Sequence, residues 1–281
     1  MITVVAVSGF VTVQDGGRPG HMHEGVPPGG PLVPELLARA NAAVGNEEHE
    51  AGLEFFGELT LAGTNGTLVA SDDGVPVMLG PRDSWRVLGA GARVRYVAVR
   101  GGIDVPRVLG GRGTLLGAAL GGHEGRALQR GDLLAVGEPG TLHEAPLGAA
   151  PDLEAAIRVV PGPDLERFEP GALDVLLDSE FRVDARSDRV GIRLIGPALR
   201  RVGDDLGASC PMLRGAIQVP ASGAPIVLGP DHPTTGGYPV LAVVVVASLG
   251  VLGARPVGAS VRFVAALGRP PAVRAPSTPG R

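Results

Sequence analysis

Apolar residues along the chain follow mostly the two-residue period of β-strands. Residues 2–13 alternate apolar and polar positions and cluster β-branched side chains, which predicts an opening strand or hairpin. Short runs of the same kind, separated by turns, fill residues 53–136 and return from residue 157 to residue 263. This spacing is typical of a sandwich or a barrel, and it predicts a mainly β protein with a few short helices.

Three segments depart from that pattern. Apolar residues between positions 32 and 44 recur at helical spacing, and Gly45 stands where the C-terminal cap of a helix belongs, so we predict a helix there. A shorter helical stretch is expected near residues 171–177. The longest apolar run, residues 240–254, contains two glycines and is shorter than the ~20 residues that cross a membrane. It is predicted to be a buried strand with a turn.

Strand-like sequence stops near the middle of the chain. We therefore predict an N-terminal half over residues 1–140, a linker over residues 141–156 and a C-terminal half over residues 157–267. Residues 268–281 hold four prolines and are expected to form a disordered tail. A faint echo between Val-Pro-Pro-Gly-Gly in the first half and Val-Pro-Ala-Ser-Gly in the second favours an internal duplication.

Composition narrows the classes of function. The formal net charge is −4, so there is no basic excess to neutralise a nucleic-acid backbone, and we expect no nucleic-acid partner. All 25 basic residues are arginine. This excludes a phosphate-loop lysine, a Schiff-base lysine and a biotin-carrying lysine on this chain. The N-terminus lacks a basic leader, and we expect a cytoplasmic protein with no membrane association.

Metal and nucleophile chemistry find little support in the sequence. His21 and His23 would face the same side of a strand, but no third ligand stands at a diagnostic spacing, so no metal site is predicted. The single cysteine, Cys210, excludes a disulfide framework and is expected to be buried rather than reactive. A nucleophile elbow of the Gly-x-Ser-x-Gly type is absent.

Longer sequence motifs, which we call words, indicate a protein family more specifically. Both the residues within each word and the order of the words along residues 3–265 carry this signal. The chain resembles the biotin-dependent-carboxyltransferase-like family, which comprises the C subunit of the bacterial ATP-dependent 5-oxoprolinase, the KipA regulators and the carboxyltransferase region of urea amidolyase. The words are TVQDGGRPGHMHEGVPPGGP (12–31), ANAAVGN (40–46), GLE (52–54), YVAVRGGIDVPRVLGGRGT (96–114), GGHEGRAL (121–128), SDRVGIRLIGP (187–197), RGAIQVPASGAPIV (214–227) and DHPTTGGYP (231–239).

The resemblance implies two cyclophilin-like β-barrel domains and a role in a complex. The first function it implies is that of a component of an ATP-dependent 5-oxoprolinase. Together with a subunit-B-like and a subunit-A-like protein, this component cleaves 5-oxoproline, a small amide, to glutamate. ATP is then used by the complex, and no cofactor is bound covalently to this chain. Two alternatives stay open: a KipA-type protein that binds a subunit-B-like inhibitor, and a carboxyltransferase acting on urea with biotin carried elsewhere.

Polar residues within the matching words suit an amide-shaped substrate. Arg18 is a candidate clamp for a carboxylate, Asp15 a candidate base, and Gln218 a candidate reader of an amide edge. The other reading is that these residues satisfy turn backbone. The predicted catalytic residues, expected to share one site between the halves, are Asp15, Arg18, Gln218, Thr234 and Tyr238, and the predicted substrate-binding residues are His23, Thr235, Gly236, Gly237 and Asp231.

The sequence also departs from the family pattern within these words. Gly29 stands where the family has serine, Val33 where it has aspartate, and Cys210 where it has glutamate. Gly111 and Gly113 replace two further serines. The loss of two carboxylates and several hydroxyls makes a diverged member with weak or no turnover a further reading.

Two arginines within the words are expected to serve the fold rather than the reaction. We predict that Arg112 and Arg126 form surface or inter-strand pairs.

Overall fold

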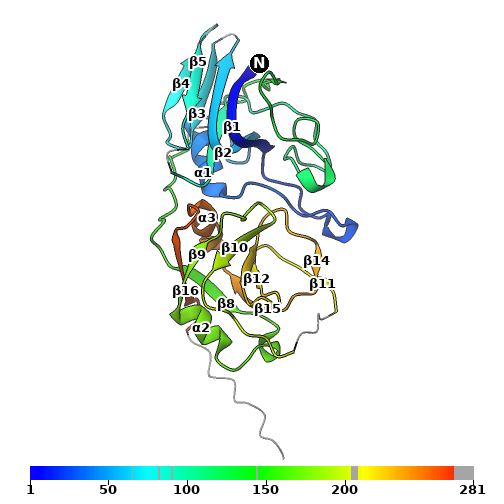
Figure 1. The fold of residues 1–281 in the computed structure, drawn as a ribbon. Helices are drawn as coiled ribbons and strands as arrows, with labels where there is room; N and C mark the ends of the chain where they lie inside the picture. The colour runs from blue at the N-terminus through cyan, green and yellow to red at the C-terminus, as the bar shows by residue number, and fades with distance from the viewer. Residues whose placement is uncertain (65, 82, 90, 144, 204–207, 269–281) are drawn as a thin grey trace, which may run out of the picture. The chain divides into compact units, whose positions relative to one another are not determined.

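The computed structural model describes residues 1–64, 66–81, 83–89, 91–143, 145–203 and 208–268 (Figure 1). The chain divides into two compact units, Met1–Leu153 and Glu154–Arg281, which we describe separately. Both are mainly β, as the sequence predicted, and the described residues hold three α-helices. No helix in the described part of the chain is long and apolar enough to cross a membrane. The predicted tail, apart from Gly268, lies outside the described residues.

The first unit is built on one antiparallel sheet. Its strand order is β4-β3-β6-β2-β1-β7, with β5 paired to β2, and no pairing among the described residues closes it. The barrel predicted for this half is therefore a half-barrel. Its strands are β1 (Ile2–Gln14), β2 (Gly52–Gly63), β3 (Thr67–Ser71), β4 (Pro76–Leu79), β5 (Ser84–Val87), β6 (Arg95–Val99) and β7 (Leu133–Leu134).

A long ribbon of β1 and β2 forms the centre of this sheet. The two strands pair along their whole length, and Gly9 faces Gly57 in the register. Both residues adopt positive φ angles, +102° and +103°, which favour glycine. A Cβ at Gly57 would lie 2.0 Å from the Ser8 carbonyl oxygen. Glycine is therefore required at this close approach of two backbones.

Helix α1 (Pro34–Ala43) confirms the helix predicted at residues 32–44. Pro34 occupies its first turn, where the missing N–H costs no hydrogen bond. Gly45 follows the helix with a φ of +73° and donates its N–H to the Ala42 carbonyl, as expected of a C-terminal cap. Leu36 and Leu37 are buried, and the helix packs against β6 and β3.

The second unit is a closed barrel of seven strands in the order β10-β13-β12-β15-β8-β16-β9. Strand β16 closes it by pairing parallel to β8 and antiparallel to β9. A separate two-stranded sheet joins β11 (Cys210–Pro211) to β14 (Thr235–Gly236). The barrel strands are β8 (Ile157–Pro161), β9 (Glu180–Val183), β10 (Gly191–Ile195), β12 (Ala216–Gln218), β13 (Ile226–Leu228), β15 (Val240–Val244) and β16 (Ser260–Ala265).

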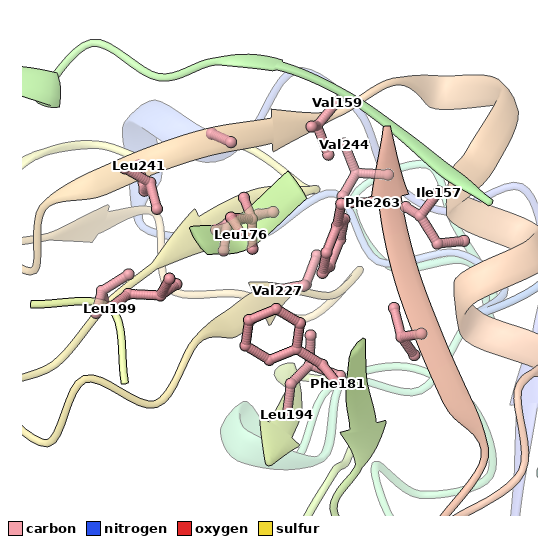
Figure 2. Close-up of a cluster of buried hydrophobic side chains, with 14 of the residues drawn as sticks. Ile157, Val159, Leu176, Phe181, Leu194, Leu199, Val227, Leu241, Val244 and Phe263 are labelled. Carbon is pink, nitrogen blue, oxygen red and sulfur yellow. The ribbon is translucent and has the colours of Figure 1, made fainter. Parts of the chain in front are cut away.

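The barrel is filled by a cluster of aliphatic and aromatic side chains (Figure 2). Phe181 and Phe263 meet edge to face, with ring centroids 5.9 Å apart, and both are fully buried. Helix α2 (Ala172–Asp178) adds Leu176 to this cluster, in agreement with the short helix expected there. Contacts of this kind hold the barrel together because they remove a continuous apolar surface from water.

The apolar run 240–254 differs from its prediction. It begins as β15 and continues as helix α3 (Val246–Ala254), so the expected turn is a helix instead. A run that is apolar on every side is compatible with a buried strand and with a buried helix. Its hydrophobic periodicity therefore does not distinguish the two structures. Leu252 and Gly253 are buried, and α3 packs against β8.

Candidate functional site

The loop that follows β1 is anchored by the carboxylate of Asp15. This carboxylate accepts hydrogen bonds from the backbone N–H groups of Gly17, Arg112 and Gly113, with N···O distances of 2.9, 2.5 and 3.1 Å. The carboxylate thus joins this loop to a segment about one hundred residues further along the chain. Within the described structure Asp15 satisfies turn backbone, which is one of the two roles that the sequence left open.

Arg18 anchors the same two segments from the other side. Its side chain is 1% exposed, and its guanidinium donates to the Gly113 carbonyl through Nη2 and to the Val108 carbonyl through Nε, the latter at 3.4 Å. The Arg18 N–H donates to the Pro28 carbonyl at 2.7 Å. A buried guanidinium needs such acceptors because transfer from water is costly. Asp15 and Arg18 therefore meet at Gly113.

A pocket of about 250 Å³ opens beside Asp15 in the first unit. Its walls come from three segments: the loop after β1, the turn that follows α1, and the loop between β6 and β7. Acidic and basic side chains line it together, which suits a ligand with both kinds of group. The lining residues are Asp15, Gly16, Gly17, Glu47, His49, Glu50, Ala51, Arg107, Gly110 and Arg112.

Several of the pocket's charged groups already have partners in the fold. The Arg112 guanidinium lies 3.2 Å from the Asp104 carboxylate and donates to the Val105 carbonyl, while its buried Nε has no hydrogen-bond partner among the described residues. Glu50 accepts the Ala51 N–H at 3.2 Å. Arg107 has no ion pair or hydrogen bond with the residues that the structure describes. One cation is thus available at the wall of the pocket.

The second unit groups part of the remaining candidate residues. Gln218 is buried, and its amide Nε2 donates to the Tyr238 carbonyl at 3.3 Å. A Cβ at Gly236 would come within 2.7 Å of the same nitrogen, so a side chain there would require the Gln218 amide to shift. The Thr234 carbonyl accepts the N–H of Met212 at 2.9 Å. The remaining members of this group are Thr235, in β14 and exposed, and Gly237, which is half-buried.

Asp231 belongs to a different arrangement in the second unit. Its carboxylate receives the guanidinium of Arg189 at 2.8 and 2.9 Å, and the two side chains are 6% and 5% exposed. The next residue, His232, is fully buried, and its Nδ1 lies 2.8 Å from the Pro233 carbonyl oxygen. Burial lowers the pKa of His232 below its ordinary value. The Asp231 carboxylate therefore forms a buried ion pair within the second unit.

The histidines after the first strand lie in a short 3-10 helix, Met22–Glu24, and its flank. His21 Nδ1 lies 2.6 Å from a Glu24 carboxylate oxygen, and this hydrogen bond holds the pKa of Glu24 below its ordinary value. His23 is exposed. Among the described residues no group of three or more histidine, cysteine or acidic side chains could hold a metal ion. The absence of a metal site stays a prediction.

The word at residues 121–128 forms a tight turn against the Asp15 and Arg18 anchor. A Cβ at Gly121 would lie 2.6 Å from Arg18 Nη2, and Glu124 has a positive φ of 55°. Arg126 pairs with Asp132 through two hydrogen bonds of 2.7 and 3.0 Å, which confirms the ion-pairing role predicted for it. This pairing lowers the pKa of Asp132 to about 2.

The departures from the family pattern have local structural settings. Val33 is the fully buried N-cap residue of α1 and donates its N–H to the Tyr96 hydroxyl at 2.9 Å. Gly29 has a φ of +65°, and a Cβ there would lie 3.7 Å from Arg18 Nη1. The prediction that Cys210 is buried is wrong, because β11 pairs with β14 outside the barrel and leaves it exposed.

The candidate residues thus form two groups. Asp15 and Arg18 meet in the first unit, whereas Gln218, Gly236 and Tyr238 meet in the second. The expectation that both groups share one site stays a prediction. Sequence reasoning missed the pocket residues Glu47, Glu50, His49 and Arg107, although Arg107 stands within the word at residues 96–114 and could have been found there.

Comparison with known proteins agrees with the fold and the sequence words. The family model "Carboxyltransferase domain, subdomain A and B" matches residues 24–265, so this chain belongs to that family. The chain is 35% identical over 281 residues to the C subunit of 5-oxoprolinase from Escherichia coli (strain K12), covering 94% of this chain and 91% of that protein. The resemblance stated above is thereby confirmed.

Urea amidolyases are similar over the same stretch. The chain is 31% identical over 305 residues to urea amidolyase of Lachancea kluyveri, covering 93% of this chain and 17% of that protein. Among solved structures, the K. lactis urea amidolyase superposes with a TM-score of 0.84 at 27% identity, covering 94% of this chain and 18% of that one. The urea amidolyase structure thus shares the fold of this chain, and the chain is similar in sequence to both kinds of relative.

Proposed function

We propose that this chain is the C-type component of an ATP-dependent 5-oxoprolinase, which acts with subunit-B-like and subunit-A-like proteins to open 5-oxoproline to glutamate. The proposal rests on one observation: identity of 35% to the C subunit of a 5-oxoprolinase, over 94% of this chain and 91% of that protein. A second such C subunit, from Haemophilus influenzae, is 32% identical over 94% of this chain.

The chemistry of lactam opening agrees with the pocket beside Asp15. Phosphoryl transfer from ATP to the amide oxygen releases ADP and activates the amide carbon. Water adds to that carbon, and the C–N bond breaks as its nitrogen takes up a proton. A second water then releases orthophosphate from the resulting acyl phosphate. A protein that contributes to this needs a cation for the substrate carboxylate and a carboxylate for proton transfer. Arg107 and Glu50 stand in the pocket wall, and Asp15 and Arg18 hold Gly113 beside it. The chain has no lysine, so a phosphate-loop lysine, if the complex uses one, lies on a partner.

Reconstitution tests the proposal. The purified chain alone should release no glutamate from 5-oxoproline and ATP, and addition of the cognate A-type and B-type proteins should give ATP-dependent release. Omission of each component in turn is the control. Glutamate release by the isolated chain, or none by the complete mixture, would contradict the proposal.

Carboxyl transfer to urea is the second candidate, because the urea amidolyase relative is 31% identical and the urea amidolyase structure superposes with a TM-score of 0.84. This reaction needs a biotin carrier on another chain, since no lysine is present here. Supplying carboxylated biotin carrier and urea, and measuring loss of the carboxyl group from biotin, would favour this function over lactam opening.

A further inference from the structure

The pocket beside Asp15 holds charges of both signs that the fold leaves available. Arg107 is exposed and has no ion pair or hydrogen bond among the described residues. Glu47, on the same pocket, is exposed, and its carboxylate likewise has no partner in the described part of the chain. Two further charged groups of the pocket are engaged in the fold, because Asp15 accepts three backbone N–H groups and Arg112 pairs with Asp104.

We propose that this pocket binds a small molecule of α-amino-acid shape, with a carboxylate held by Arg107 and an N–H group on the neighbouring carbon held by Glu47. A guanidinium matches a carboxylate with two parallel hydrogen bonds, and a carboxylate accepts from an amine or an amide N–H. The identity of the ligand rests on the proposed function: 5-oxoproline and glutamate both have this shape, one with a neutral ring N–H and one with an ammonium.

The size and the rigidity of the pocket support this class of ligand. A volume of about 250 Å³ lies below the roughly 300–1,000 Å³ of sites for drug-sized molecules, so it suits a small organic acid rather than a nucleotide. Glu47 begins a turn in which its carbonyl accepts the Glu50 N–H, and the preceding Asn46 is fixed by hydrogen bonds from its amide to Asn41 and Val99.

The pocket segment that contains Arg107 is fixed in a similar way. The loop that contains Arg107 is held by reciprocal backbone hydrogen bonds between Val108 and Gly111 and by the Arg112 side chain on the Val105 carbonyl. Arg107 and Glu47 therefore stand on backbone that needs little ordering when a ligand binds. Preorganisation of this kind lowers the entropic cost of binding.

Binding is measured on the full chain by calorimetry with 5-oxoproline, glutamate, pyrrolidin-2-one, which lacks the carboxylate, and glutarate, which lacks the amine. We expect 5-oxoproline or glutamate to bind and the two analogues to bind at least about tenfold more weakly, since a charge-assisted hydrogen bond is lost in each. Binding of glutamate alone would identify a product or amino-acid site, and binding of 5-oxoproline alone a substrate site; either supports the proposal.

Variants assign the roles. Arg107→Gln should weaken binding at least about tenfold, and Glu47→Gln should weaken it also. The control variants Arg130→Gln and Glu138→Gln change exposed residues outside the pocket and should leave binding unchanged. Far-ultraviolet circular dichroism confirms that each variant folds. In the reconstituted complex, Arg107→Gln should raise KM for 5-oxoproline by the same factor.

The outcomes separate this proposal from the proposed function. A complex that opens 5-oxoproline with an unchanged KM after Arg107→Gln overturns the pocket assignment and leaves the function intact. Arg107-dependent binding in a complex without turnover overturns the function and leaves the pocket. If no ligand binds the full chain and KM is insensitive to Arg107, the pocket assignment is wrong.

Discussion

Replacing Asp231 by asparagine would remove one half of a buried ion pair while keeping its shape. The Arg189 guanidinium lies 2.8 and 2.9 Å from the two carboxylate oxygens, and both side chains are almost fully excluded from solvent. An asparagine leaves the guanidinium buried opposite a neutral amide. The guanidinium then loses the attraction of the Asp231 carboxylate in a medium that screens this interaction poorly.

The size of the effect follows from this burial. Removing one partner of a buried pair costs about 3–5 kcal/mol. With a urea m-value of about 2 kcal/mol/M, the midpoint of unfolding of the second unit should fall by roughly 1.5–2.5 M. Glu58→Gln is the matched control, because the Glu58–Arg86 pair is exposed and should be worth less than about 1 kcal/mol.

The assay uses two probes of urea unfolding. Trp85, the single tryptophan, lies in β5, so its fluorescence reports on the first unit, whereas circular dichroism reports on both. Asp231→Asn should move the dichroism transition and leave the fluorescence transition in place. Replacing both members by Arg189→Met and Asp231→Leu should restore most of the loss. A stable Asp231→Asn protein that loses only activity would refute the structural role and favour the substrate-binding role predicted from sequence.

Two further predictions concern stability. Phe181→Ala removes a fully buried ring that meets Phe263 in the barrel core. Thermal or urea unfolding should show that the free energy of unfolding falls by about 3–5 kcal/mol, and a fall below about 1 kcal/mol would contradict the packing. Arg126 lowers the pKa of Asp132 from 3.8 to about 2. The contribution of this ion pair to the free energy of unfolding is therefore complete above pH 4 and is lost as the pH falls towards 2. The free-energy difference between wild type and Asp132→Asn should shrink over that interval, and a constant difference would contradict the pairing.

Local elements were predictable from the sequence where one period dominated. Helix α1 has an apolar stripe, a proline in its first turn and Gly45 after its end, so every local signal agreed with the fold. Helix α3 was missed because its residues are apolar on every side, and a buried helix of that kind has no polar face to reveal its period.

The candidate site was predictable only in part, because its geometry depends on distant segments. The sequence words pointed to Asp15 and Arg18 but gave no sign that both would meet Gly113. Arg189 and Asp231 stand in two separate words, and nothing in either reveals the buried pair that the barrel creates. Glu47 and Arg107 reach one pocket through the placement of two loops, which no local pattern encodes.

Closure of the barrel by its last strand has a consequence for biosynthesis. Strand β16 pairs with both β8 and β9, so the second unit cannot complete its hydrogen-bonded ring until residue 265 has left the ribosome. Until then β8 and β9 each present an unpaired edge, which is a template for association with other chains. The first unit, whose strands all precede residue 135, faces no such delay. A chain cut short before β16 would therefore end as an open, adhesive sheet rather than as a smaller barrel.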